Sequence, residues 1–192
     1  MEEGRQQLTL ILQSCAEGNP TAQRRLYKLF YGYAMGIALR FSEGKAEAQE
    51  IVNDTFLKIF SKFDMFDETL EFKPWLRKVV VNSAIDYHRK YHKLQSVDEN
   101  VFPIDQKVTT KNAVWDKLNY EQVLTHIQKL SPAYRLVFSL FAIEGYKHHE
   151  IAKKLNISIG SSKSNYARAK KKLQEELEAE ISSEIRGQLY ER

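Results

Sequence analysis

Apolar residues recur at intervals of three and four along most of the chain, the spacing that places them on one face of an α-helix. No segment alternates strictly between apolar and polar residues, as a half-buried strand would. The pattern predicts helices over residues 5–16, from Asn19 or Thr21 to 41, and over 43–63, 73–93, 113–130, 132–144, 147–155 and 160–182. The sequence therefore predicts an all-α protein.

The periodicity stops between residues 94 and 112. This stretch is rich in Gln, Ser, Asp, Asn and Thr, contains Pro103 and has no apolar face, so it is typical of a linker. We expect two small helical domains, residues 1–93 and 113–192, joined by the flexible linker 94–112. The second domain contains a helix-turn-helix pattern, described below.

Length and composition narrow the class of protein. The chain has 192 residues and a single cysteine, Cys15, which argues against a disulfide framework and a Cys-based zinc site. Its longest apolar runs are too short to span a bilayer. The first residues are acidic and lack the basic-then-apolar order of a signal peptide. We therefore expect a cytoplasmic protein without stable membrane insertion.

The net charge of +4 hides a strong segregation of charge along the chain. Residues 146–173 contain eight basic side chains and one acidic, and residues 72–93 contain six basic and one acidic. Residues 43–71 are acidic, with eight carboxylates and three basic side chains. Two separate basic blocks are expected of a protein that contacts phosphate at two places. The alternative is that they are ordinary solvated helix faces.

Residues 147–173 have the spacing of a helix-turn-helix, a short helix followed by a turn and a long basic helix. Ala152 is small where the two helices would cross, and Ile157 would fill the turn. On the second helix, one face carries Ser162, Tyr166, Ala169, Leu173 and Leu177. The other face carries Lys163, Ser164, Ala167, Arg168 and Lys171.

One packed face and one face of donors is what a recognition helix needs in the major groove. We also expect the backbone N–H groups of Ser161 and Ser162, near the helix start, to be available to a phosphate. The alternative is an α-hairpin whose lysine face is merely solvated.

The sequence offers little support for an enzyme. The run His148, His149 and Glu150 has two ligand types for a metal, but adjacent histidines point in different directions on a helix and no third ligand is suitably spaced. A Gly-rich phosphate loop, a nucleophile elbow and a paired-acid arrangement are all missing. We therefore expect no catalytic residues, no metal site and no cofactor.

Both halves of the chain resemble domains of bacterial sigma factors of the sigma-70 family. Residues 130–173, with LSPAYRLVF, EGY, EIA, GSSKS and RAK, are similar to the promoter-reading C-terminal domain. Residues 47–89 are similar to the other sigma domain. There EIVNDTFLK resembles the polymerase-binding helix, and FKPWLRKVVVN with Asp86 and Arg89 resembles the promoter-melting helix. With only these two domains and a linker, the chain looks like the extracytoplasmic-function (ECF) group.

The resemblance implies a role for particular residues. Contacts with the polymerase are implied for Glu50, Asn53, Asp54 and Lys58. Contacts with the minus-ten element are implied for Phe66, Arg77, Lys78, Asn82 and Arg89. Contacts with the minus-thirty-five element are implied for Lys163, Ser164, Ala167 and Arg168, with Lys171 on the same face. Phe66 and Trp75 could instead be core residues. The family commonly has Thr-Val where this chain has Ser161-Ser162, and a bulkier residue where this chain has Ala167. These departures affect which promoter sequence is preferred and not how the helix docks.

The partners implied by the resemblance are core RNA polymerase, promoter DNA in duplex and melted form, and an anti-sigma factor. We expect a monomer when the protein is free, because no unexplained apolar stripe remains. The runner-up interpretation is a stand-alone helix-turn-helix transcription regulator. The acidic helix over 43–63 distinguishes the two, because a sigma factor needs a polymerase-binding helix and a simple regulator does not.

Overall fold

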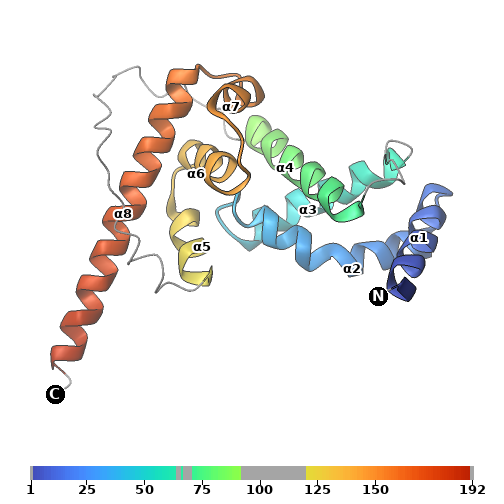
Figure 1. The fold of residues 1–192 in the computed structure, drawn as a ribbon, viewed down its shortest axis with the longest axis horizontal. Helices are drawn as coiled ribbons and strands as arrows, with labels where there is room; N and C mark the ends of the chain where they lie inside the picture. The colour runs from blue at the N-terminus through green and yellow to red at the C-terminus, as the bar shows by residue number, and fades with distance from the viewer. Residues whose placement is uncertain (1, 64–65, 67–70, 92–119, 191–192) are drawn as a thin grey trace. The chain divides into compact units, whose positions relative to one another are not determined.

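The computed structural model describes residues 2–63, 66, 71–91 and 120–190, with side chains between 6 and 180 in those ranges. The described residues form helices joined by turns, with no strand among them, which confirms the all-α prediction. The chain divides into two compact units, Met1–Tyr87 and His88–Arg192 (Figure 1). The predicted linker 94–112 lies outside the described residues, and the predicted domain boundaries stay predictions. None of the described helices has the length and apolar character needed to cross a bilayer.

Four of the described helices contribute to the first unit, each close to a range that the periodicity predicts, and the fourth continues for about one turn beyond the unit's last residue, Tyr87. They are α1 (Glu2–Ala16), α2 (Pro20–Ala38), α3 (Lys45–Ser61) and α4 (Phe72–Tyr91). The second helix ends three residues before its predicted end at Phe41. The chain tightens there, because the N–H groups of Arg40 and Phe41 bond to carbonyls only three residues back. The Phe41 side chain is still fully buried, so its apolar position reflects packing after the helix has ended.

The start of α2 is fixed by a side-chain cap. The Oδ1 atom of Asn19 accepts hydrogen bonds from the N–H groups of Thr21, at 2.9 Å, and Ala22, at 3.2 Å. Pro20 occupies the first helical position, where its missing N–H costs nothing. Of the two capping residues that the sequence allows, the structure therefore selects Asn19.

The core of the first unit is rich in aromatic rings. The Phe30 ring on α2 lies 4.8 Å from the Phe72 ring on α4, between centroids, and Phe56 on α3 is 2% exposed. Cys15 on α1 is buried as well, and burial raises the pKa of its thiol to about 11. The thiol therefore stays protonated at neutral pH and acts as a small packing group.

The second unit is built around one long helix. Its helices are α5 (Tyr120–Lys129), α6 (Pro132–Phe138), the π-helix η3 (Ser139–Ile143), α7 (His148–Leu155) and α8 (Ile159–Tyr190). The predicted helix over 132–144 is present, but its second half winds as a π-helix. The last helix extends eight residues beyond its predicted end at 182. Gly145, with φ of +76°, ends the helical stretch where the sequence predicts.

Contacts with α8 hold the second unit together. Ile127 and Leu130, at the end of α5, pack with Ala169 and Leu173 of α8. Buried His126 reaches the same helix, with its two ring nitrogens 3.1 Å from Glu176 and 2.5 Å from Glu180. Residues 169–180 of α8 are therefore anchored to α5. The same helix also packs against α6 and α7.

Candidate DNA-binding and polymerase-binding faces

Helix α7, a short turn and helix α8 form the helix-turn-helix that the spacing predicts. Asn156 ends α7 in the left-handed conformation, with φ of 54° and ψ of 48°, which asparagine adopts more readily than most residues. The N–H of Ile157 donates to the carbonyl of Ala152 at 3.1 Å. Ala152 on α7 is 7% exposed, in keeping with a small residue at a helix crossing, and Ile157 in the turn is half-buried.

Helix α8 has the two faces that its sequence predicts. Ser162, Ala169, Leu173 and Leu177 are buried, and Tyr166 is half-buried. On the other face Lys163 and Lys171 are exposed and Ser164, Ala167 and Arg168 are half-buried. The sequence analysis missed Asn165, which is also buried. Its spacing of three from Ser162 and four from Ala169 is the signal that would have placed it on the packed face.

The prediction for the first turn of α8 is wrong. The N–H of Ser161 donates to Oγ of Ser158 at 2.9 Å, and the N–H of Ser162 donates to the Ser158 carbonyl at 3.0 Å. Ser158 thus caps the helix and satisfies donors that a phosphate would otherwise use. A serine just before a helix is a common cap, and the sequence carries this signal.

An aromatic cluster supports the start of α8. The His148 ring stacks on Phe141, with centroids 4.3 Å apart, and its Nδ1 lies 3.0 Å from Oγ of Ser162. Burial, together with the positive charge of Lys163, lowers the pKa of His148, so the imidazole is neutral at neutral pH. Tyr166 packs on Phe141 at 4.5 Å, and burial raises its pKa. No group of three potential metal ligands occurs in the described part of the chain.

The exposed face of α3 carries the residues predicted to bind the polymerase. Glu50, Asn53 and Asp54 are exposed, while Phe56 faces the core. Oδ1 of Asn53 accepts a hydrogen bond from the hydroxyl of Tyr27 on α2, at 3.0 Å. Burial raises the pKa of Tyr27, as does neighbouring Tyr31, which keeps this hydroxyl a donor.

Leu57 lies on the same face and was missed by the sequence analysis. Its side chain is 66% exposed, directly after buried Phe56 and one turn beyond Asn53. A leucine off the apolar stripe of an amphipathic helix is the signal that could have found it. The face of α3 therefore combines polar groups with one large apolar side chain.

Lys58 points toward α4. Its ammonium nitrogen lies 2.8 Å from Oδ2 of Asp86 and 3.3 Å from Oγ of Ser83. The structure thus brings Lys58 into contact with α4, and Glu50, Asn53 and Asp54 are exposed on α3.

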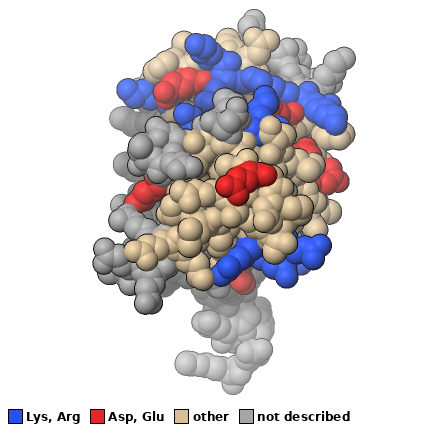
Figure 2. Space-filling model, turned by 90° about the vertical axis from the view of Figure 1, so that its right-hand side faces the viewer, with Lys and Arg blue, Asp and Glu red and all other residues tan. Residues whose placement is uncertain are grey.

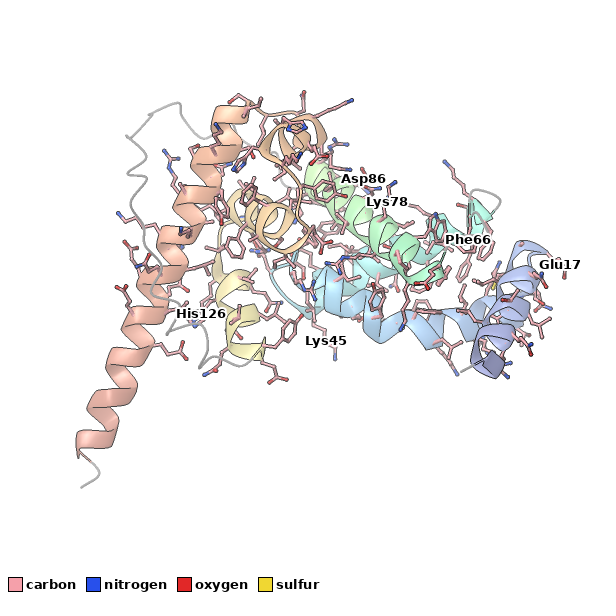
Figure 3. All side chains as sticks on the ribbon, in the orientation of Figure 1. Glu17, Lys45, Phe66, Lys78, Asp86 and His126 are labelled. Carbon is pink, nitrogen blue, oxygen red and sulfur yellow. The ribbon has the colours of Figure 1, made fainter. Side chains whose placement is uncertain are left out.

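The polar face of α4 holds most of the residues predicted to meet the minus-ten element. Lys78 and Arg89 are exposed, while Arg77 and Asn82 are half-buried. Figure 3 shows Lys78 and Asp86 projecting from the same side of this helix. The opposite side is core, with Leu76, Val80, Ala84 and Ile85 buried.

Phe66 differs from the other predicted minus-ten residues because it is buried. It is 7% exposed, and its ring centroid lies 4.9 Å from that of Trp75 and 5.5 Å from that of Phe72. These contacts favour the alternative that Phe66 and Trp75 are core residues. Most of the loop around it, residues 64–65 and 67–70, lies outside the described residues.

Charged side chains are unevenly distributed over the surface. On the face that Figure 2 shows, Lys and Arg side chains gather in separate groups, with uncharged side chains and a few acidic ones between them. A surface of this kind offers phosphate-binding areas without being basic throughout.

Two family models match the chain. The model described as sigma-70 region 2 matches residues 26–93, and the model described as sigma-70, region 4 matches residues 120–173. The first range contains most of α2 and all of α3 and α4. The second runs from α5 into the first half of α8. The matched ranges therefore contain all three of the helix faces described above.

Several known proteins are similar along most of their length. The ECF RNA polymerase sigma factor SigM of Bacillus subtilis (strain 168) is 25% identical over 150 residues, which cover 77% of this chain and 90% of SigM. The RNA polymerase sigma factor CnrH of Cupriavidus metallidurans is 26% identical over 181 residues, covering 89% of this chain and 94% of CnrH. A solved structure of CnrH in complex with the cytosolic domain of CnrY covers 89% of this chain and 97% of that one at 25% identity. Its TM-score of 0.43 is too low to support a comparison of the folds. From the two matched regions and these relatives, the chain belongs to the sigma-70 family, in its ECF group, and as a sigma factor it directs transcription initiation by RNA polymerase.

Proposed function

We propose that this sigma factor binds core RNA polymerase through the exposed face of α3. The observation that carries the proposal is the composition of this face, on which Glu50, Asn53 and Asp54 lie beside exposed Leu57. Polar groups around a desolvated apolar centre are typical of specific protein interfaces. A stand-alone regulator, the second candidate, has no use for such a face on a helix that otherwise packs in the core.

The minus-thirty-five element is the proposed ligand of α8. Lys163, Ser164, Ala167, Arg168 and Lys171 share the face of this helix that points away from the core. Arg168 is the residue best suited to a bidentate contact with guanine, which contributes about 1–3 kcal/mol of discrimination against other bases. The small Ala167 next to it leaves room for a base edge or a thymine methyl group.

The minus-ten element is the proposed ligand of α4. Lys78 and Arg89 would bind backbone phosphates, with salt-dependent affinity, and Asn82 offers an amide to an unstacked base. Arg77 is half-buried and would act at the edge of this face. Buried Phe66 would form the wall behind a flipped base and support it through Trp75, with no exposed ring for stacking.

Further aspects of the proposal concern the whole protein. The sigma factor would act in the cytoplasm as a regulatory subunit, and the polymerase would perform the chemistry with its own magnesium. It would be monomeric when free and controlled by an anti-sigma factor. CnrH is solved with the cytosolic domain of CnrY, and the sigma factor RpoE of Bartonella quintana with the anti-sigma factor NepR.

Co-elution with bacterial core RNA polymerase tests the proposal. The native chain should co-elute with core polymerase, and the double variant Asn53→Ala/Asp54→Ala should not. The matched control is Gln6→Ala/Gln7→Ala, which also removes two exposed polar side chains from a helix of the same unit and should co-elute normally. If the native chain fails to bind the polymerase and still binds duplex DNA tightly, the proposed function is wrong and the stand-alone regulator is favoured.

A further inference from the structure

One ion pair connects the two functional helices of the first unit. The ammonium group of Lys58 on α3 is held at two points on α4, by the carboxylate of Asp86 at 2.8 Å and the hydroxyl of Ser83 at 3.3 Å. Ser83 is buried, with 2% exposure, so the lysine side chain lies along α4. Lys58 lies one turn after Asp54 on α3, and its ammonium group reaches α4.

Asp86 is an anion in the middle of a basic face. Counting by fours along α4, it lies in one line with Lys78, Asn82 and Lys90, and Arg89 flanks the line. Lys78, Asp86, Arg89 and Lys90 are all exposed. A carboxylate at this position would repel DNA phosphates directly. It would also be able to pair with Lys90, four residues further along the same helix.

We propose that Lys58 is a positioning residue for DNA binding by α4. It pairs the Asp86 carboxylate with a cation from α3, which offsets the repulsion between this anion and the phosphate backbone. The inference rests on the proposed function of α4 and changes the role of Lys58, which acts through Asp86 on the DNA side. Contact with the polymerase is left to Glu50, Asn53 and Asp54.

Exposed ion pairs contribute little to stability, about 0–1 kcal/mol, and the side chains of Lys58 and Asp86 are 46% and 55% exposed. The pair is therefore a weak structural device. Its effect is expected on the affinity for phosphate, where a single misplaced charge at low salt changes binding roughly three- to tenfold.

A double-mutant cycle on the full chain tests this role. Binding is measured by fluorescence anisotropy with a labelled mixed-sequence duplex of about 25 base pairs, at about 50 mM salt and again at about 500 mM. Lys58→Met should weaken binding about three- to tenfold at the lower salt concentration and much less at the higher one. Lys58→Arg should bind as the native chain does, because a guanidinium preserves the pair.

The second substitution of the cycle is Asp86→Asn. In the Lys58→Met background it should restore binding to within about twofold of the native chain, because no carboxylate is left to be positioned. In the native background Asp86→Asn should increase the affinity for the duplex by a smaller factor. The matched control is Lys62→Met, which removes one charge at the end of α3, one turn from Lys58. In that background Asp86→Asn should improve binding no more than it does in the native chain. Equal gains from Asp86→Asn in all three backgrounds would overturn the proposal, because net charge alone would then explain them.

Two further measurements separate failure of this inference from failure of the proposed function. Lys58→Met should co-elute with core polymerase as the native chain does, and a loss as complete as that of Asn53→Ala/Asp54→Ala would return Lys58 to the polymerase face and overturn the inference alone. Lys78→Met should weaken binding to the same duplex. If it does not, α4 makes no contact with this duplex and the inference is wrong, whereas the proposed minus-ten role, which concerns the promoter element and an unstacked base, is not contradicted.

Discussion

The two units use their helices in different ways. In the first unit the candidate faces lie on separate helices, α3 for the polymerase and α4 for DNA, and an aromatic core lies beneath both. In the second unit the candidate DNA contacts lie on one helix, α8. Each of the three helices buries core residues on its other side, so the difference is that the first unit offers separate faces to two partners and the second unit offers one face to DNA.

Loss of a core ring should have the largest effect and should be confined to one unit. Phe56→Ala should lower the free energy of unfolding of the first unit by about 3–5 kcal/mol, because it leaves a cavity beside Tyr27 and Phe60. Urea unfolding can be followed by Trp75 fluorescence in a Trp115→Phe background. The helix signal of the second unit should keep its own midpoint. A single transition that shifts as a whole would contradict the independence of the units.

A change on the outer face of α8 should affect DNA binding and leave the core intact. Arg168→Ala should weaken binding to promoter duplex by about 1–3 kcal/mol, because the bidentate contact with guanine is lost. Arg168→Lys retains the charge but loses the planar fork, so it should restore little of this specificity. The measurement is a competition between promoter and mixed-sequence duplexes, with the midpoint of unfolding as the control. Full recovery in the lysine variant would show that Arg168 binds only phosphate.

The polymerase face should be more tolerant than the DNA face of α8. Tyr27→Phe removes the hydrogen bond that orients Asn53 and keeps the ring packed on Phe56. The affinity for core polymerase should fall by about 0.5–1.5 kcal/mol, with the unfolding midpoint nearly unchanged. Titration of labelled protein with core polymerase measures this. An unchanged affinity would mean that Asn53 needs no support from α2.

Acidification should have the smallest effect, through His148 of the second unit. The pKa of His148 is lowered below its ordinary value of 6.5 in the folded protein, so the unfolded chain takes up the proton first. The stabilisation by neutral His148 is therefore complete above pH 6.5 and is lost as the pH falls from there through the lower folded pKa. The unfolding midpoint of the second unit should decline over this range, and the decline should be smaller in His148→Gln. An identical pH dependence in both proteins would rule out His148 as its cause.

Periodicity was sufficient to predict the helices and the two faces of α8, because both depend on residues close together in the sequence. It could not predict the π-helix η3, whose apolar residues would suit an ordinary helix equally well. The end of α2 was placed too late for a related reason, since Phe41 is buried after the helix has ended.

The polar contacts of the site were beyond sequence reasoning. Lys58 and Asp86 are 28 residues apart and Tyr27 and Asn53 are 26 apart, so their pairing depends on how α3 packs against its neighbours. The resemblance named Lys58 and Asn53 and gave no information about the side chains that hold them. Phe66 was predicted to meet a base, and its aromatic neighbours Phe72 and Trp75 were visible in the sequence only as separate apolar positions.

The length of α8 gives the second unit a mechanical property. Its 32 residues extend about 48 Å at 1.5 Å per residue, from the residues proposed to read bases to a distant C-terminal end. Leu177 and the contacts of Glu176 and Glu180 with His126 hold the helix near its middle. The base-reading part of the helix also packs against α6 and α7, so it can move only together with them. Residues 181–190 extend the helix by about 15 Å beyond the His126 contacts, so a molecule that binds this extension would act on the packed helices of the unit and not on α8 alone.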